Sequence, residues 1–333
     1  MSAVPVELFL GVDGGGSKTL AVIVDALGRE RGRGVAGSSN QEAAGFAVAL
    51  TELRAAVARA TVTAGAALPL RAAWLGLAGV DRPEDGERFS PEVRALAEIV
   101  RITNDAELAL GALPRMAGVA LIAGTGSIAR GRDTRGVAAR VGGWGHVLGD
   151  EGSGYAIGQQ ALQAAARAAD GRGPPTTLLE RILAYWRLQA SVDLIERAYQ
   201  PFDKTAIAAL APLVLMCARE GDGPARGIVT HAVEELALAA ITVTGALDFP
   251  AGRVPLALGG GLLLRAASLR ARVLRGIART RAMDAVLVKE PALSGARALA
   301  AMCAGGDDAR LAGIEVNGQM HPVWQRNDRT TDQ

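Results

Sequence analysis

The run GVDGGGSKT at residues 11–19 combines residue types that suit the binding of a phosphate chain. Consecutive glycines leave backbone N–H groups bare enough to approach an anion, and hydroxyl and ammonium donors follow directly. The residues expected to contact phosphate are Gly14, Gly15, Gly16, Ser17, Lys18 and Thr19. Asp13 is predicted to serve a Mg²⁺ ion, which prefers oxygen ligands, with a plain turn former as the alternative.

This glycine run does not fit the two common nucleotide-binding loops. In a Walker A loop, lysine follows glycine directly and a helix comes next, whereas here Ser17 intervenes and TLAVIVDALG (19–28) predicts a strand. In the dinucleotide fingerprint, the third glycine would fall on Thr19. Because VELFLG (6–11) also predicts a strand, we expect the loop to close a hairpin.

The same arrangement returns at residues 118–133, GVALIAGTGSIARGRD, as a strand, a glycine turn and a second strand. The turn consists of Gly124, Thr125, Gly126 and Ser127. Two such units predict a duplicated architecture, with an N-terminal lobe at 1–116 and a C-terminal lobe at 117–333. Each lobe would supply one hairpin to a shared cleft, so that one phosphate chain is held from both sides.

Asp105 in ITNDAEL stands where a predicted strand ends and a helix begins. An Asp in this position can cap the helix. It can also act as the general base that accepts the proton of an attacking hydroxyl in phosphoryl transfer. Such a base contributes about 100- to 10,000-fold to the rate. The spacing alone leaves both roles open.

Two more glycine segments are candidates for binding. GGWGHVLGDEGSGY (142–155) places Trp144, His146 and Asp150 among glycines that are costly to order without a ligand or a close backbone approach. A structural loop is the alternative, and one histidine makes no metal site, so His146 is expected to be structural. After a later strand, the wall of a nucleotide pocket is predicted at Gly259, Gly260 and Gly261.

The rest of the chain alternates helical and strand patterns, which predicts an α/β fold. Helices are expected at 41–65, from 82, at 262–278 and at 294–304. Strands are expected at 71–79, 99–103, 254–258 and 285–289. Between residue 155 and about residue 248 the patterns are mostly helical, and after about 307 little periodicity remains.

The composition favours a globular protein that acts on small molecules. The 333 residues are 50% hydrophobic with a net charge of +2, so neither nucleic acid nor a membrane is an expected partner. Cys217 and Cys303 offer no disulfide framework, which fits a reducing cytoplasm. We find no export signal, and the apolar stretch LALAAITVTGAL falls short of the roughly 20 residues of a membrane span.

Six motifs, in order and with sensible spacing, carry a resemblance to a known family. They are GVDGGGSKT, GLAG (76–79), TNDA (103–106), IAGTGS (122–127), GGWGHVLGDEGS (142–153) and LGGG (258–261). Together they resemble the sugar kinases of the actin-like ATPase superfamily, and more closely the group of N-acetylglucosamine kinase and the BadF/BadG/BcrA/BcrD-type ATPases. The resemblance covers residues 8 to about 300. It implies two ribonuclease-H-like lobes with ATP and Mg²⁺ in an interlobe cleft, and it leaves a homodimer open.

The resemblance also implies roles by position. Asp13 would serve Mg²⁺ and Asp105 would be the base. The positions that match phosphate and adenosine contacts are Gly15, Ser17, Lys18, Thr19, Thr125, Gly126, Gly260 and Gly261. The positions that match sugar contacts are Asn40, Asn104, Asp105, Gly143, Trp144, Gly145 and Asp150.

The function that the resemblance implies is ATP-dependent phosphorylation of an amino sugar, foremost N-acetylglucosamine at its 6-hydroxyl. Glucosamine kinase and N-acetylmuramic acid kinase are the near alternatives, and a regulatory ATPase acting on a partner protein is the alternative of another class. The related dehydratase activators hold an iron–sulfur cluster through cysteines, and the repressor-linked sugar kinases carry a cysteine-rich zinc loop. This sequence lacks the cysteines for either.

Overall fold

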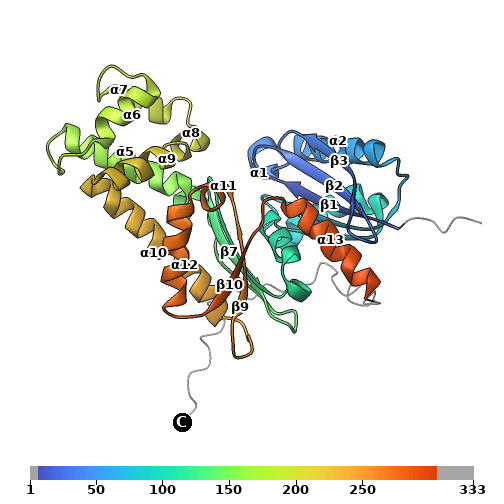
Figure 1. Ribbon diagram of the computed structural model, residues 1–333. Coiled ribbons are helices and arrows are strands. Elements are labelled where there is room, and N and C mark those ends of the chain that lie inside the picture. Colours follow the sequence, from blue (N-terminus) through green and yellow to red (C-terminus); the bar gives the residue numbers. More distant parts are fainter. Residues whose placement is uncertain (1–6, 306–333) are drawn as a thin grey trace, which may run out of the picture.

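The N-terminal strands form a five-stranded mixed sheet in the computed structural model, which describes residues 7–305 (Figure 1). The strands are β1 (Leu8–Gly14), β2 (Thr19–Asp25), β3 (Glu30–Ala36), β4 (Leu70–Leu77) and β5 (Ala97–Thr103). In the order β3-β2-β1-β4-β5, β1 runs antiparallel to β2 and parallel to β4. Gly14 pairs with Thr19, so the predicted glycine loop is the tip of a tight hairpin.

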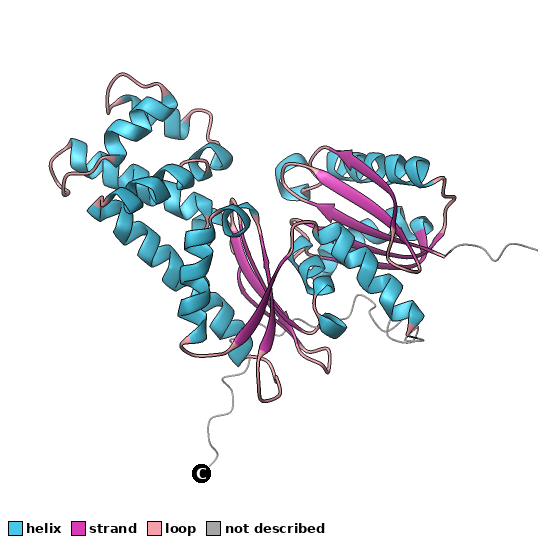
Figure 2. Cartoon of the chain, in the orientation of Figure 1, coloured by secondary structure: helices cyan, strands magenta, loops and turns pink. Residues whose placement is uncertain are grey.

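Helices cover both faces of this sheet (Figure 2). Leu10 packs with residues of α2 (Phe46–Ala64), and its neighbour Phe9 packs with residues of α13 (Pro291–Ala304). Because successive side chains of a strand point to opposite faces, a sheet covered on both faces needs apolar residues in succession. This explains why β2 is buried along its whole length.

The second sheet repeats the topology of the first. Its strands are β6 (Gly118–Ala123), β7 (Ser127–Arg132), β8 (Ala138–Gly142), β9 (Val254–Gly259) and β10 (Met283–Leu287). The order is β10-β9-β6-β7-β8, again with an antiparallel hairpin beside a parallel pair. The predicted duplication and the α/β fold class of two ribonuclease-H-like lobes are confirmed, and Figure 1 shows the lobes side by side.

The residue pattern of the strand β3 gives no strand signal of its own, because it reads ERGRGVA and lacks apolar alternation. Its glycines have a packing role instead. A Cβ atom on Gly32 would overlap the carbonyl oxygen of Ala60, and one on Gly34 would overlap that of Ala56. Small residues therefore let α2 lie directly on this edge of the sheet.

Helices dominate the second lobe between its third and fourth strands, and no strand interrupts residues 156–248. They are α5 (Gly154–Ala169), α6 (Leu178–Trp186), α7 (Asp193–Tyr199), α8 (Lys204–Ala208), α9 (Ala211–Glu220) and α10 (Gly223–Gly245). Within residues 7–305, α10 is the one helix with the length and hydropathy of a membrane span. Half of that stretch is buried inside the lobe, as in a core helix.

Two predicted helices are each divided by a residue with non-helical backbone angles. Gly45, with φ 81°, separates α1 (Gln41–Ala44) from α2. Ala266, with φ −90° and ψ 78°, separates α11 (Gly261–Arg265) from α12 (Ala267–Ala278). The remaining short elements are α3 (Pro83–Val93), α4 (Gly145–Leu148), η1 (Arg94–Leu96), η2 (Asp105–Ala112) and η3 (Pro114–Met116).

The last described helix, α13, returns to the N-terminal lobe, where it packs against β1, β2, β4 and η2. A Cβ atom on Gly11 would overlap the carbonyl oxygen of Ala292, so the helix lies against the backbone of β1. The division expected at residue 116 therefore does not describe α13, because the second face of the first sheet needs this helix as its cover. The predicted tail after residue 307 lies outside the described residues.

Candidate active site

The tip of the first hairpin is open to solvent. The Gly15 N–H donates to the Lys18 carbonyl at 3.0 Å, which closes the turn, and Gly16, Ser17 and Lys18 are exposed. Thr19 differs from its predicted neighbours, because it is fully buried. Its hydroxyl donates to the Gly37 carbonyl at 2.7 Å and is hydrogen-bonded to the hydroxyl of Ser39 at 2.8 Å. Thr19 thus anchors the loop rather than lining its open side.

Asp13 lies at the carboxyl end of β1, directly before this turn. Its side chain is half-buried, and burial together with the carboxylate of Asp105 raises its pKa to about 7, although Lys18 opposes the rise. The structure therefore brings the two predicted acidic residues into electrostatic range of each other.

Asn104 and Asp105 follow the end of β5, and Asn104 rather than Asp105 caps the helix that begins there. Asn104 is the N-cap of η2, since its side-chain oxygen accepts from the Ala106 N–H at 3.0 Å. The Asp105 carboxylate also accepts from this N–H, at 2.9 Å. Burial raises the pKa of Asp105 to about 6, against the lowering effect of Arg130. Gly76 of β4 makes room, because a Cβ atom there would lie 3.0 Å from the Asp105 Cα.

The second hairpin is held in place by hydrogen bonds to Asp150 and Glu151. Its turn closes with the Gly124 N–H donating to the Gly126 carbonyl at 2.9 Å, and the Ser127 hydroxyl donates to the Glu151 carbonyl at 2.7 Å. Thr125 is exposed at the tip. Gly126 has little room for a side chain, because a Cβ atom there would lie 2.7 Å from the Asp150 carboxylate.

Asp150 supports this hairpin, and its predicted sugar contact stays a prediction. It is buried, accepts from the Ser127 N–H at 3.1 Å and forms an ion pair with Lys204 at 2.7 Å. Both of its carboxylate oxygens are thus engaged by protein groups. No sequence signal points to Lys204, because nothing in its spacing marks a partner 54 residues from Asp150.

The loop that follows β8 contains the predicted sugar residues Gly143, Trp144 and Gly145. Both glycines have positive φ, 71° and 78°, which fixes the path of the loop. Trp144 is 57% exposed, and its ring lies 4.7 Å from the Arg140 guanidinium. His146 packs against the rings of Tyr155 and Phe202, in keeping with a structural role.

The third glycine segment lies beside the second hairpin. Gly260 has φ 82°, and a Cβ atom there would overlap the backbone of Ala123 at the end of β6. A Cβ atom on Gly124 would lie 3.4 Å from the Gly261 nitrogen. Gly259 ends β9. The predicted adenosine contact of this segment stays a prediction.

Asn40 lies between elements of the N-terminal lobe. Its side-chain oxygen accepts from the Glu42 N–H at 2.9 Å, and a Cβ atom on Gly79 would lie 3.2 Å from that oxygen. Its amide nitrogen lies 4.0 Å from the Cβ position of Gly16 in the first hairpin. Asn40 is thus placed at the hairpin, and its predicted sugar contact stays a prediction.

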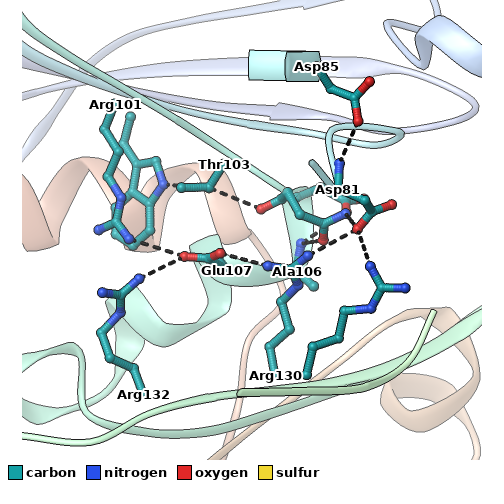
Figure 3. A network of polar contacts seen from close by, with 12 residues as sticks. Asp81, Asp85, Arg101, Thr103, Ala106, Glu107, Arg130 and Arg132 are labelled. Atoms are coloured by element: carbon teal, nitrogen blue, oxygen red, sulfur yellow. Dashed lines mark hydrogen bonds and ion pairs between the residues drawn. The ribbon is translucent and has the colours of Figure 1, made fainter. Parts of the chain in front are cut away.

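An ion-pair network between the lobes was not anticipated from the sequence (Figure 3). The Glu107 carboxylate of η2 pairs with Arg130 at 2.7 Å and with Arg101 and Arg132 at 3.1 Å. Burial raises the pKa of Glu107, but the arginines outweigh it and hold the pKa below the ordinary value. Asp81 pairs with Arg130 as well. The alternation of Arg130 and Arg132 in SIARGRD, which puts both on one strand face, was the only available signal.

The sequence profile of the BadF/BadG/BcrA/BcrD ATPase family matches residues 10–281. The chain is similar to an N-acetylmuramic acid/N-acetylglucosamine kinase of Clostridium acetobutylicum, at 36% identity over 259 residues, 76% of this chain and 85% of the relative. It is also similar to an N-acetyl-D-glucosamine kinase of Dictyostelium discoideum, at 36% identity over 245 residues, 69% of this chain and 77% of the relative.

Among solved structures, the chain is similar to a provisionally named N-acetylglucosamine kinase from Chromobacterium violaceum. The TM-score is 0.71 at 28% identity, over 89% of this chain and 99% of the other. The resemblance drawn from the six sequence motifs is thereby confirmed.

Proposed function

We propose that this chain, which belongs to the BadF/BadG/BcrA/BcrD ATPase family, transfers a phosphoryl group from ATP to a hydroxyl of an amino sugar. The observation that carries the proposal is the position of Asp105. This carboxylate stands at the start of η2, an element in contact with both sheets, and within electrostatic range of Asp13 beside the first hairpin. A carboxylate so placed can act on an acceptor hydroxyl while two glycine hairpins hold phosphate.

The residues divide the work of phosphoryl transfer, which consists mainly of positioning and charge stabilisation. Asp105 accepts the proton of the sugar hydroxyl on its carboxylate. A pKa of about 6 leaves it ionised at neutral pH and still basic enough to take the proton. The exposed N–H groups and side chains at Gly16–Lys18 and at Thr125 orient the phosphates.

Mg²⁺ fits the environment of Asp13. This carboxylate is half-buried beside a second carboxylate. Burial and the charge of Asp105 raise its pKa, and a bound cation would favour its ionised form again. Asp13 would hold the ion, which neutralises phosphate charge when bound. Residues 7–305 contain no cluster of three or more His, Cys, Asp or Glu able to bind a metal ion. A Mg²⁺ held by one carboxylate, phosphate oxygens and water needs no such cluster.

N-acetylglucosamine, phosphorylated at its 6-hydroxyl, is the acceptor that we propose first. The names of both curated relatives include it, and one also includes N-acetylmuramic acid. Glucosamine is the remaining alternative, because a third relative, from Vibrio cholerae, is a glucosamine kinase. Asn40, Asn104 and the exposed Trp144 would bind the sugar, and we place the reaction in the cytoplasm.

The test is ADP formation with ATP and Mg²⁺ against N-acetylglucosamine, N-acetylmuramic acid, glucosamine, N-acetylmannosamine and glucose. One amino sugar should stimulate turnover, and Asp105→Asn should lower kcat for it by about 100-fold or more. Asp133→Asn is the matched control, since Asp133 is a buried carboxylate at the far end of β7. Turnover that no sugar stimulates would instead favour the regulatory ATPase.

The pH profile supplies a second test of Asp105. Because only the ionised carboxylate can accept a proton, kcat should rise with pH through about 6 in the wild type. The residual activity of Asp105→Asn should lack this limb. A wild-type kcat that is flat from pH 5 to pH 8, with chemistry rate-limiting, would contradict the assignment of the base.

A further inference from the structure

Asp81 lies in the turn between β4 and α3, and three hydrogen bonds converge on one of its carboxylate oxygens. Its Oδ1 accepts from Asn104 Nδ2 at 3.1 Å, from Arg130 Nη2 at 3.0 Å and from Arg140 Nη1 at 3.1 Å. Asn104 belongs to the N-terminal lobe, whereas Arg130 and Arg140 face each other on β7 and β8 of the C-terminal lobe. One oxygen therefore links both lobes.

Each of the three donors also contacts, or adjoins in the chain, a different part of the candidate site. Asn104 precedes Asp105 and caps η2. Arg130 lies on the strand that begins at Ser127, the last residue of the second glycine turn. Its Nη1 also donates to Glu107 of η2 at 2.7 Å.

Arg140 donates hydrogen bonds to the loop that contains Trp144. Its Nε donates to the Gly142 carbonyl at 3.0 Å, and its Nη2 donates to the Gly143 carbonyl at 3.3 Å. The same guanidinium lies over the Trp144 ring. The orientation of this loop therefore depends on a side chain whose third hydrogen-bond acceptor is Asp81.

The turn around Asp81 is itself held in place. The Asp81 N–H donates to the Asp85 carboxylate in the first turn of α3 at 3.3 Å (Figure 3), and the Arg82 N–H donates to it at 3.0 Å. The Arg130 side chain is only 3% exposed, so its charge depends on its acidic partners. Charge-assisted hydrogen bonds of this kind are stronger and more directional than neutral ones.

We propose that Asp81 is a positioning residue that aligns the Asp105 base with the Gly142–Trp144 loop across the two lobes. The inference rests on the proposed sugar kinase function. It assigns to Asp81 the relative placement of the acceptor hydroxyl and the base, so its loss lowers kcat and weakens sugar binding while ATP binding stays close to normal.

The test compares Asp81→Asn with Asp133→Asn in the full-length chain. Asp133 is also a carboxylate that accepts three hydrogen bonds, from the N–H groups of Arg135 and Val137 and from the Arg135 side chain, but in the turn at the far end of β7 and β8. For Asp81→Asn, we expect kcat/KM for the sugar to fall at least 30-fold, with KM for ATP within threefold of wild type. Asp133→Asn should leave both constants within twofold. Equal constants in the two variants would overturn the proposal.

A double-mutant cycle with Arg140→Gln separates positioning from general destabilisation. If Asp81 acts on the loop through Arg140, the double variant should be about as impaired as Asp81→Asn alone, because both changes break the same chain of contacts. Multiplied effects would contradict the proposal. Asp81→Glu, which keeps the charge, should recover part of the lost kcat/KM, and no recovery would count against it.

Amide hydrogen exchange provides a readout that does not depend on turnover. In Asp81→Asn without ligands, exchange should rise in segments 104–112 and 142–149 and stay unchanged in α10. If the wild type phosphorylates no sugar and this pattern still occurs, the proposed function fails and the positioning role stands. If the wild type is active and the two segments exchange as before, the positioning role fails.

Discussion

At the residue scale, Asp13 and Asp105 are two acidic residues in positions where the ionised form is disfavoured, because the pKa of each is raised. Both carboxylates are partly buried, and the repulsion between them adds to the effect of burial on Asp13. Burial without a full set of partners costs stability, and sites of function are where such costs are commonly found. We infer that the ionised Asp13 carboxylate is more stable with a cation bound beside it than in the unliganded chain.

This inference predicts that Asp13→Asn stabilises the unliganded protein while it impairs catalysis. The folded-state pKa of about 7 lies above the ordinary value of 3.8, so the folded chain binds more protons than the unfolded chain between these pH values. Stability therefore falls as the pH rises through this window. At pH 8, Asp13→Asn should raise the free energy of unfolding by about 1 to 2 kcal/mol, after allowance for solvent screening of this half-buried side chain.

Urea denaturation at pH 8 and pH 5 measures the effect. At pH 5 the gain should be less than half of that at pH 8, because Asp13 is already almost fully protonated in the folded chain. Asp133→Asn, which removes an acceptor of three hydrogen bonds, should lower the stability at both pH values. A loss of stability in Asp13→Asn at pH 8 would refute the explanation.

At the element scale, the two hairpins could be predicted from the sequence because each joins apolar strands through glycines. The glycine turn and the change from strand to helix period are local features, and they located Asp13, Asp105 and the second turn. The N-cap role of Asn104 needed the structure, because Asn104 and Asp105 suit an N-cap equally well.

The features that the sequence did not predict depend on contacts between distant segments. The edge strand β3 is made of charged residues and glycines, and only the approach of α2 explains them. Asp81, Arg130 and Arg140 come from separate turns and strands, so no spacing rule brings them to one oxygen. The engagement of Asp150 by Lys204 is of the same kind.

The docking of α13 predicts that Gly11→Ala is strongly destabilising. The added methyl group would overlap the Ala292 carbonyl oxygen and would lie 2.9 Å from the Ala296 nitrogen, so the helix must move away from β1. Overpacking of this kind costs about 1 to 3 kcal/mol or more. Gly227→Ala in α10, where a Cβ atom meets nothing within 4 Å, should instead stabilise the helix by about 0.5 to 1 kcal/mol. Thermal unfolding of both variants would show opposite shifts, and equal shifts would contradict this packing.

At the scale of the whole molecule, the two lobes have separate cores. One large apolar cluster belongs to the second lobe, and two belong to the faces of the first sheet. A small cluster joins Ala109 and Leu110 of η2 to Ala120 of β6 and Ala257 of β9. Among the described residues, η2 is thus in contact with both sheets through apolar packing as well as through Glu107. The lobes are therefore joined through η2 and the ion pairs of Glu107 and Asp81 rather than through one common core.

Because the lobes have separate cores, we predict that binding of the acceptor sugar brings them closer together. Closure would remove water from Asp105 and limit the hydrolysis of ATP, the usual purpose of such motions in transferases. Small-angle X-ray scattering should show a smaller radius of gyration when the sugar that stimulates turnover is added at saturation. A sugar from the same panel that gives no turnover is the matched control and should leave the radius unchanged. An unchanged radius with the active sugar would mean that the lobes are already locked, and exclusion of water would then have to come from the Gly142–Trp144 loop alone.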